Sequence, residues 1–185
     1  MSEYHRTLRP RSGHRPAGCW VLTSLCLATS LTILVGNVPA QVMSDDAELT
    51  RLRSKAEDAI AGGDPDGAAM MMGRAALLSA QMAKKREGTS GTVSRRMESL
   101  FRSQEHTYRA MGLFRRAGNQ LPASSGVCGS LSLAVASLRQ AAEPIGDLSS
   151  PPPTPRLSED VAQLTETIDT WKTVIDSTIA EYQCP

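Results

Sequence analysis

Few side chains in this 185-residue chain have the types and spacing that catalysis needs. After residue 40 there is one histidine, His106, and no set of motifs that supplies a nucleophile, a base and an orienting acid. At about 100° per residue, His106 points away from the apolar stripe of its segment, which predicts a solvent-facing side chain rather than a haem or metal ligand. We assign no catalytic and no metal-binding residue. A catalytic function that uses carboxylates such as Asp169 or Asp176 ranks third, after the binding and carrier functions described below.

Cys128 and Cys184 are the two cysteines that follow residue 40. In an oxidising compartment an even pair is by default one disulfide, and these two lack the CxxC spacing of redox-active pairs. If the segments that carry them pack antiparallel, both thiols lie at the same end of the fold. We predict a structural disulfide, which contributes about 4 kcal/mol by restricting the unfolded chain.

The chain contains eight methionines, including the run Met70-Met71-Met72. Methionine at helical spacing usually fills gaps in a core, and this is the main interpretation. Thioethers also bind Cu(I). A periplasmic carrier of a metal, haem or an apolar ligand in a Met-rich bundle is therefore the alternative function, although we predict no cofactor.

The clearest surface pattern is a stripe of four arginines at seven-residue intervals: Arg95, Arg102, Arg109 and Arg116. Residues spaced by seven share one face of a helix. Residues 84–116 hold nine basic and three acidic side chains, whereas residues 41–66 and 156–185 each carry a net charge of −4. The stripe predicts a face that binds an acidic protein or an anionic membrane surface. The alternative is a solvated face with intrahelical pairs, because Glu98 and Glu105 each precede an arginine by four residues.

Composition excludes some classes of protein. The formal net charge is +1 and aromatic residues make up 4% of the chain, which argues against a basic nucleic-acid-binding protein and against a sheet sandwich. We expect no specific nucleic-acid binding. Oligomeric state is not predicted by any pattern in the sequence.

The first forty residues have the composition of an export signal. Four arginines precede an uncharged apolar run, Cys19–Val38, and Val38-Pro39-Ala40 ends with a small residue of the kind that signal peptidase requires. This predicts a signal peptide over residues 1–40 and a periplasmic or secreted protein. Because about twenty apolar residues can also cross a membrane, an uncleaved anchor over residues 19–38, with an extracytoplasmic body, is the alternative.

Apolar periodicity and helix punctuation predict five helical segments after residue 40, with no competing strand pattern. Ser44 caps the first, and Asp64-Pro65 begins the second, which ends before a predicted breaker at residues 88–91. The third and fourth carry apolar stripes over residues 93–114 and 127–142, and Ser158 caps the last.

The predicted fold is an all-α, antiparallel helical bundle of about five helices, built from two or more helical hairpins and preceded by a signal peptide or signal anchor. Residues 41–143 form the hairpins, and residues 144–157, which include five prolines, form a Pro-rich linker. Residues 158–185 form the C-terminal helix of the same bundle.

Part of the first hairpin resembles a tetratricopeptide repeat. The resemblance depends on these residues: Leu52, Ala56, Ala59, Gly63, Asp64, Ala68, Met72 and Ala75. It covers about 34 residues, without the aromatic positions of the family and without a second copy. The resemblance implies peptide or protein binding and assigns no binding residue. The export signal, the missing catalytic constellation and the segregated charge together favour a non-catalytic helical bundle that acts as a binding or scaffolding module in the cell envelope.

Overall fold

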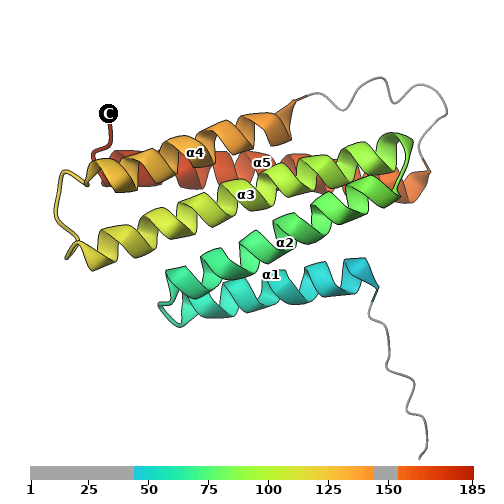
Figure 1. The fold of residues 1–185 in the computed structure, drawn as a ribbon. Helices are drawn as coiled ribbons and strands as arrows, with labels where there is room; N and C mark the ends of the chain where they lie inside the picture. Colours follow the sequence, from blue (N-terminus) through green and yellow to red (C-terminus); the bar gives the residue numbers. More distant parts are fainter. Residues whose placement is uncertain (1–43, 144–153) are drawn as a thin grey trace, which may run out of the picture. The chain divides into compact units, whose positions relative to one another are not determined.

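The computed structural model describes residues 44–143 and 154–185. These residues form five α-helices and no strand, in agreement with the predicted helical bundle (Figure 1). The helices are α1 (Asp45–Ala61), α2 (Pro65–Lys85), α3 (Gly88–Arg116), α4 (Ser125–Ala142) and α5 (Pro155–Glu181). The predicted signal peptide, the alternative anchor and residues 144–153 of the predicted linker lie outside the described residues. None of the described helices combines the length and apolar character that a membrane span requires.

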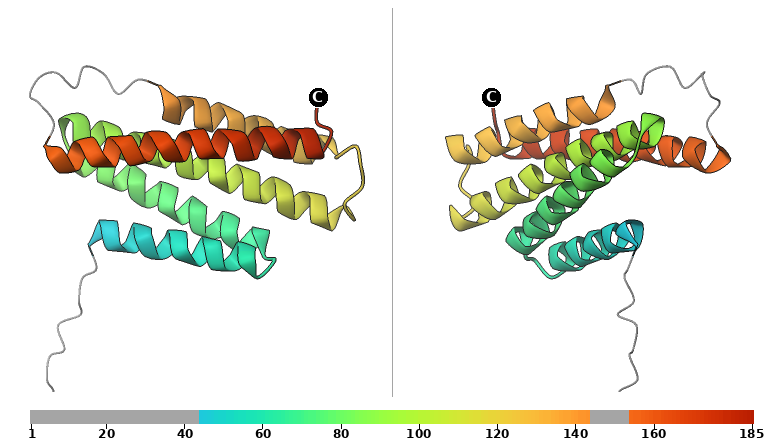
Figure 2. Two further views of the ribbon diagram at one scale, coloured as in Figure 1. Left: turned by 180° about the vertical axis from the view of Figure 1, so that it is seen from behind. Right: turned by 45° about the vertical axis from the view of Figure 1, so that its right-hand side comes forward.

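Helix α3 is the central element of the bundle. It is 29 residues long and contacts α2, α4 and α5, whereas α1 packs on α2. Consecutive helices run in opposite directions, and α5 lies antiparallel to α4 (Figure 1 and Figure 2). Helix α3 is therefore shared by two groups of helices, α1–α2–α3 and α3–α4–α5.

The core is built from small and aliphatic side chains, as the low aromatic content indicates. Between α1 and α2 the packing is close because Ala56, Ala68 and Ala75 are fully buried and add little bulk. Tyr108 of α3 meets Trp171 of α5 edge to face, with ring centroids 5.4 Å apart. Burial raises the pKa of Tyr108 to about 12. Trp171 packs against the cores of both groups of helices, so this aromatic contact lies where the two cores meet.

The starts of α1 and α2 are those that the sequence predicts. The Ser44 hydroxyl accepts a hydrogen bond from the Ala47 backbone N–H at 3.2 Å. Asp64 Oδ1 accepts one from the Gly67 N–H at 2.9 Å, with Pro65 in the first turn. Each cap satisfies an N–H that the helix itself leaves unpaired, so the boundaries follow from local chemistry.

The predicted start of the last helix, with Ser158 as its cap, is wrong by one turn. Helix α5 begins at Pro155, and Thr154 is its N-cap, accepting a hydrogen bond from the Leu157 N–H. Proline suits the first helical position because its φ is helical and because it lacks an N–H, which at this position would have no partner within the helix. Pro155 is therefore a helix-start residue and not a linker proline, and residues 155–157 belong to the helix.

The predicted breaker at residues 88–91 is also wrong, because these residues form the first turn of α3. Gly88 has a φ of +57°, which suits the sharp turn from α2. A Cβ on Gly91 would lie 2.4 Å from the backbone oxygen of Arg86. Gly91 therefore allows a close approach between two helices and does not interrupt one.

Cys128 and Cys184 lie at disulfide distance, in agreement with the predicted pair. Their Cα atoms are 5.4 Å apart and their sulfur atoms 2.01 Å apart. Cys128 is in the first turn of α4 and Cys184 follows the end of α5, so the antiparallel packing of these helices brings them together. The Ala123 N–H also donates a hydrogen bond to the Tyr182 carbonyl at 2.9 Å, which fixes the chain at the same end.

Candidate functional site

Three of the four predicted arginines lie where α3 crosses α2. Arg102 and Arg109 both pair with Glu105, at 2.9 and 2.7 Å. Arg116 reaches across to Asp66 of α2. The predicted pair between Glu105 and Arg109 is thus present, but Arg102 pairs with Glu105 and not with Glu98.

Arg95 is set apart from the other three. Its guanidinium donates to the Thr92 hydroxyl at 3.0 Å, within its own helix, and it does not line the groove between α2 and α3. Residues seven apart drift by about 20° per interval around a straight helix, so a stripe of four gradually turns away from a neighbour. The structure therefore groups Arg102, Arg109 and Arg116 but leaves Arg95 outside the group.

Helix α2 supplies a part of this surface that the sequence analysis missed. A groove of about 410 Å³ lies between α2 and α3, and Arg74 lines it together with two exposed apolar side chains, Met70 and Leu77. These two side chains are 51% and 55% exposed, although both are large and apolar. Their spacing with Arg74 is that of one helix face, a signal that could have been read from the sequence. Arg116 does not line the groove itself but pairs with Asp66, which does. We name this surface the arginine face: Met70, Arg74, Leu77, Arg102, Arg109 and Arg116.

The carboxylates beneath the arginine face are held by close contacts between α2 and α3. Glu105 is only 8% exposed. A Cβ on Gly73 would lie 3.2 Å from Glu105 Cδ, so the glycine makes room for this carboxylate. Gly112 of α3 has the same relation to Asp66, at 2.5 Å. Each helix thus places a carboxylate over a glycine of the other, and the arginines neutralise both.

His106 is more buried than predicted. Its side chain is partly exposed, but Nδ1 is inaccessible to solvent and has no hydrogen-bond partner among residues 44–143 and 154–185. Burial lowers the pKa of His106, with Arg109 and Arg102 acting in the same direction and Glu105 opposing them. The neutral imidazole is therefore favoured at neutral pH.

The methionines are spread over the bundle. Met72 and Met82 are buried in the core between α1, α2 and α3, whereas Met70 belongs to the arginine face. In the described ranges, no group of three or more His, Cys, Asp or Glu side chains could hold a metal ion. Met72 thus fills the core, as the main interpretation of the methionine run predicts. Met70 is exposed and contributes to the surface instead.

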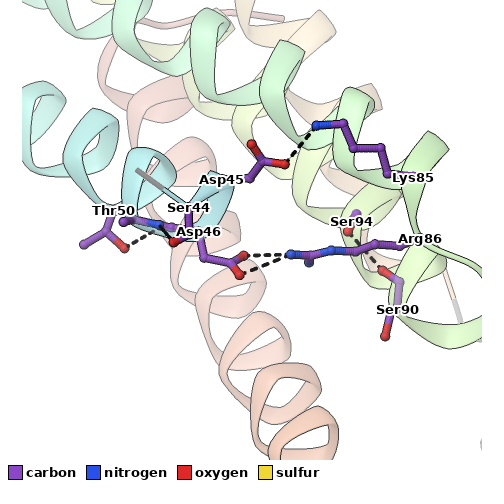
Figure 3. Close-up of polar contacts among 9 residues, drawn as sticks. Ser44, Asp45, Asp46, Thr50, Lys85, Arg86, Ser90 and Ser94 are labelled. Carbon is purple, nitrogen blue, oxygen red and sulfur yellow. Dashed lines mark hydrogen bonds and ion pairs between the residues drawn. The ribbon is translucent and has the colours of Figure 1, made fainter. Parts of the chain in front are cut away.

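A second concave region lies where the starts of α1 and α5 face each other across α3. It is a cleft of about 470 Å³ with an apolar floor and arginines on its walls. At its edge, Arg86 donates from one guanidinium nitrogen to both carboxylate oxygens of Asp46, at 3.0 and 3.2 Å (Figure 3). Lys85 pairs with the neighbouring Asp45 at 3.1 Å, so two ion pairs tie the start of α1 to the end of α2.

Comparison with family models, curated proteins and solved structures finds no match to this chain. The tetratricopeptide resemblance therefore gains no support beyond the α1–α2 hairpin itself. The assignment of function depends on the two concave surfaces alone.

Proposed function

We propose that this chain is an exported, non-catalytic binding module of the cell envelope, and that its arginine face binds an acidic segment of another protein. The observation that supports this proposal most directly is the position of Met70 and Leu77, two exposed apolar side chains on either side of Arg74. Exposed apolar side chains among cations suit a partner that carries both carboxylates and apolar side chains.

Charge on the arginine face favours an anionic partner. The face has four arginines, and the carboxylates of Asp66 and Glu105 compensate only two of these charges. The side chains of Arg109 and Arg116 remain 51% and 53% exposed, so they can bind a second carboxylate while keeping the first. Arg74 has no ion pair within the described residues.

The concave shape favours a protein segment over a lipid surface. A groove of about 410 Å³ can receive protruding side chains, in the way that an amphipathic helix inserts its apolar positions into a receptor groove. A bilayer surface presents no such protrusions. The carrier of a metal, haem or an apolar ligand in a Met-rich bundle remains the alternative function.

The proposal is tested with a photoreactive residue in place of Leu77 in the exported protein. We expect a covalent adduct with an acidic protein in the native envelope. The matched control is the same residue in place of Leu133 of α4, which is 54% exposed and lies outside the face. Equal adducts from both positions, or none from Leu77, contradict the proposal.

A second measurement tests how much the arginine charges contribute to binding while the apolar side chains Met70 and Leu77 stay in place. The triple variant Arg74→Gln, Arg102→Gln and Arg109→Gln should weaken binding of an acidic amphipathic peptide at least tenfold, with unchanged circular dichroism. The control variant changes three exposed cations elsewhere: Lys55→Gln, Arg139→Gln and Lys172→Gln. Binding to phosphatidylglycerol vesicles but to no acidic peptide would identify a membrane-binding face and overturn the proposed partner.

A further inference from the structure

The cleft between α1 and α5 is a separate surface from the arginine face. Its walls are the first turns of α1, from Asp46 to Arg53, and the first half of α5, from Thr154 to Thr167. Helix α3 forms the floor, and α1 makes no backbone contact with α5 among the described residues. The cleft therefore lies where the two groups of helices separate.

The floor of the cleft is suited to an apolar chain. Its α3 side chains include Val93, Met97 and Leu100, and Leu164 of α5 continues the same surface. Met97 packs against the buried apolar residues of both groups of helices, so the floor continues into the core. A volume of about 470 Å³ is within the range of small-molecule sites.

Gln104 supplies an unpartnered polar group in the cleft. Its side chain is 5% exposed, and Oε1 has no hydrogen-bond partner in the described part of the chain. Buried polar atoms are nearly always paired, and an exception needs an explanation. This oxygen is an acceptor, so a hydrogen-bond donor that arrives with a ligand, such as a water bound to its head group, would satisfy it.

Two arginines on opposite walls give the cleft its charge preference. Arg86 is occupied by Asp46, but Arg53 of α1 and Arg156 of α5 make no ion pair within the described residues. The acidic side chains lining the cleft are the paired Asp46 and the exposed Asp160. The N-terminal turns of α1, α3 and α5 also border the cleft, and their partial positive charges add to the preference for an anion.

We infer that this cleft binds a single-chain amphipathic carboxylate, such as a medium-chain fatty acid. The alkyl chain lies on the apolar floor, and the carboxylate binds between Arg53 and Arg156. Gln104 Oε1 accepts a hydrogen bond from a water molecule that also donates to the bound carboxylate. This inference does not depend on the arginine face, and either site can fail without the other.

The inference is tested by calorimetric titration of the full chain with decanoate, decanol and decyltrimethylammonium, each below its micelle concentration. Decanoate should bind with one site per chain and at least tenfold more tightly than the other two probes. Equal affinity for decanol would show that the arginines do not recognise the head group, and would overturn the inference. Absence of decanoate binding would overturn it as well.

Variants locate the site. Arg53→Glu with Arg156→Glu should weaken decanoate binding at least tenfold, as expected for lost charge-assisted hydrogen bonds. The control is Lys55→Glu with Lys172→Glu, which makes the same charge change on the same two helices outside the cleft. If both variants lose the same affinity for decanoate, the loss is caused by the change in net charge, and the inference is contradicted.

Gln104→Leu separates a ligand-binding role from a structural one. This change removes the unpartnered amide while keeping a similar volume, so the ligand-free protein should melt at a higher temperature. Decanoate binding should nevertheless weaken by about three- to tenfold. Unchanged affinity would contradict the water-mediated contact between Gln104 and the carboxylate.

Discussion

The carboxylate of Glu105 in α3 lies directly over Gly73 in α2, where a Cβ would stand 3.2 Å from Glu105 Cδ. The glycine lets a nearly buried carboxylate approach the neighbouring helix, and Arg102 and Arg109 hold it from the other side. Glu105 is thus both a packing group at the helix crossing and the counter-ion that reduces the charge of the arginine face. Its removal should affect stability and binding in opposite directions.

Glu105→Gln should lower stability and strengthen anion binding. Loss of two charge-assisted hydrogen bonds costs about 1 kcal/mol, because both arginines are partly exposed and regain water. The arginine face gains one positive charge, which should tighten binding of an acidic peptide about fivefold at low salt. Urea unfolding and fluorescence anisotropy measure the two effects. Glu98→Gln is the control, since Glu98 does not line the face, and an equal gain there would assign the effect to net charge.

Loss of the Cys128–Cys184 bond should lower stability by about 4 kcal/mol, because the unfolded chain gains the freedom that the bond removes. For a domain of this size the melting temperature should fall by roughly 10 °C or more. Calorimetry of Cys128→Ser, and of the native protein with and without reductant, measures this change. Cys128→Ser should be insensitive to reductant. A reductant effect in that variant, or no loss of stability in it, would contradict a structural disulfide.

Ser79 and Ser103 allow a matched comparison of two fully buried hydroxyls. Ser103 Oγ donates to the Ala134 carbonyl of α4 at 2.8 Å, whereas Ser79 Oγ has no partner in the described structure. Ser103→Ala should therefore cost about 1 kcal/mol, and Ser79→Ala should be neutral or stabilise by up to about 1 kcal/mol. Urea unfolding of the two variants measures the difference. The same loss in both would mean that Ser79 has a hydrogen-bond partner.

The starts of α1 and α2 were predictable because a single local signal decides each of them. Ser44 and Asp64 satisfy free N–H groups at their helix starts, and this chemistry does not depend on distant residues. Gly91 shows the limit, since glycine is read as a helix breaker unless the neighbouring backbone is known. Its role is set by the close approach of Arg86, which is a property of the packed structure.

The candidate site was only half predictable. The arginine spacing in α3 indicated one wall, but the other wall depends on which face of α2 meets α3. The spacing of Met70, Arg74 and Leu77 indicates a shared face of α2, but the run Met70-Met71-Met72 does not show which methionine is exposed. The cleft over Gln104 combines three helices that are far apart in the sequence, so no local pattern could indicate it.

The pH dependence of stability should contain a contribution from His106. Burial lowers its pKa from the ordinary value of 6.5, so the unfolded chain binds a proton at a higher pH than the folded protein does. The free energy of unfolding should therefore decrease as the pH falls below about 6.5, until the folded protein also takes up the proton. Arg102 and Arg109 add to the lowering, and Glu105 opposes it.

Two measurements test this contribution. An NMR titration of the full chain, with the His106 resonance assigned by its loss in His106→Gln, should give a midpoint below 6.5. Urea unfolding between pH 7.5 and 5 should show a smaller loss of stability in His106→Gln than in the native protein, because glutamine does not titrate. A midpoint above 6.5, or the same pH dependence in both proteins, would show that Glu105 outweighs burial or that the imidazole is solvated.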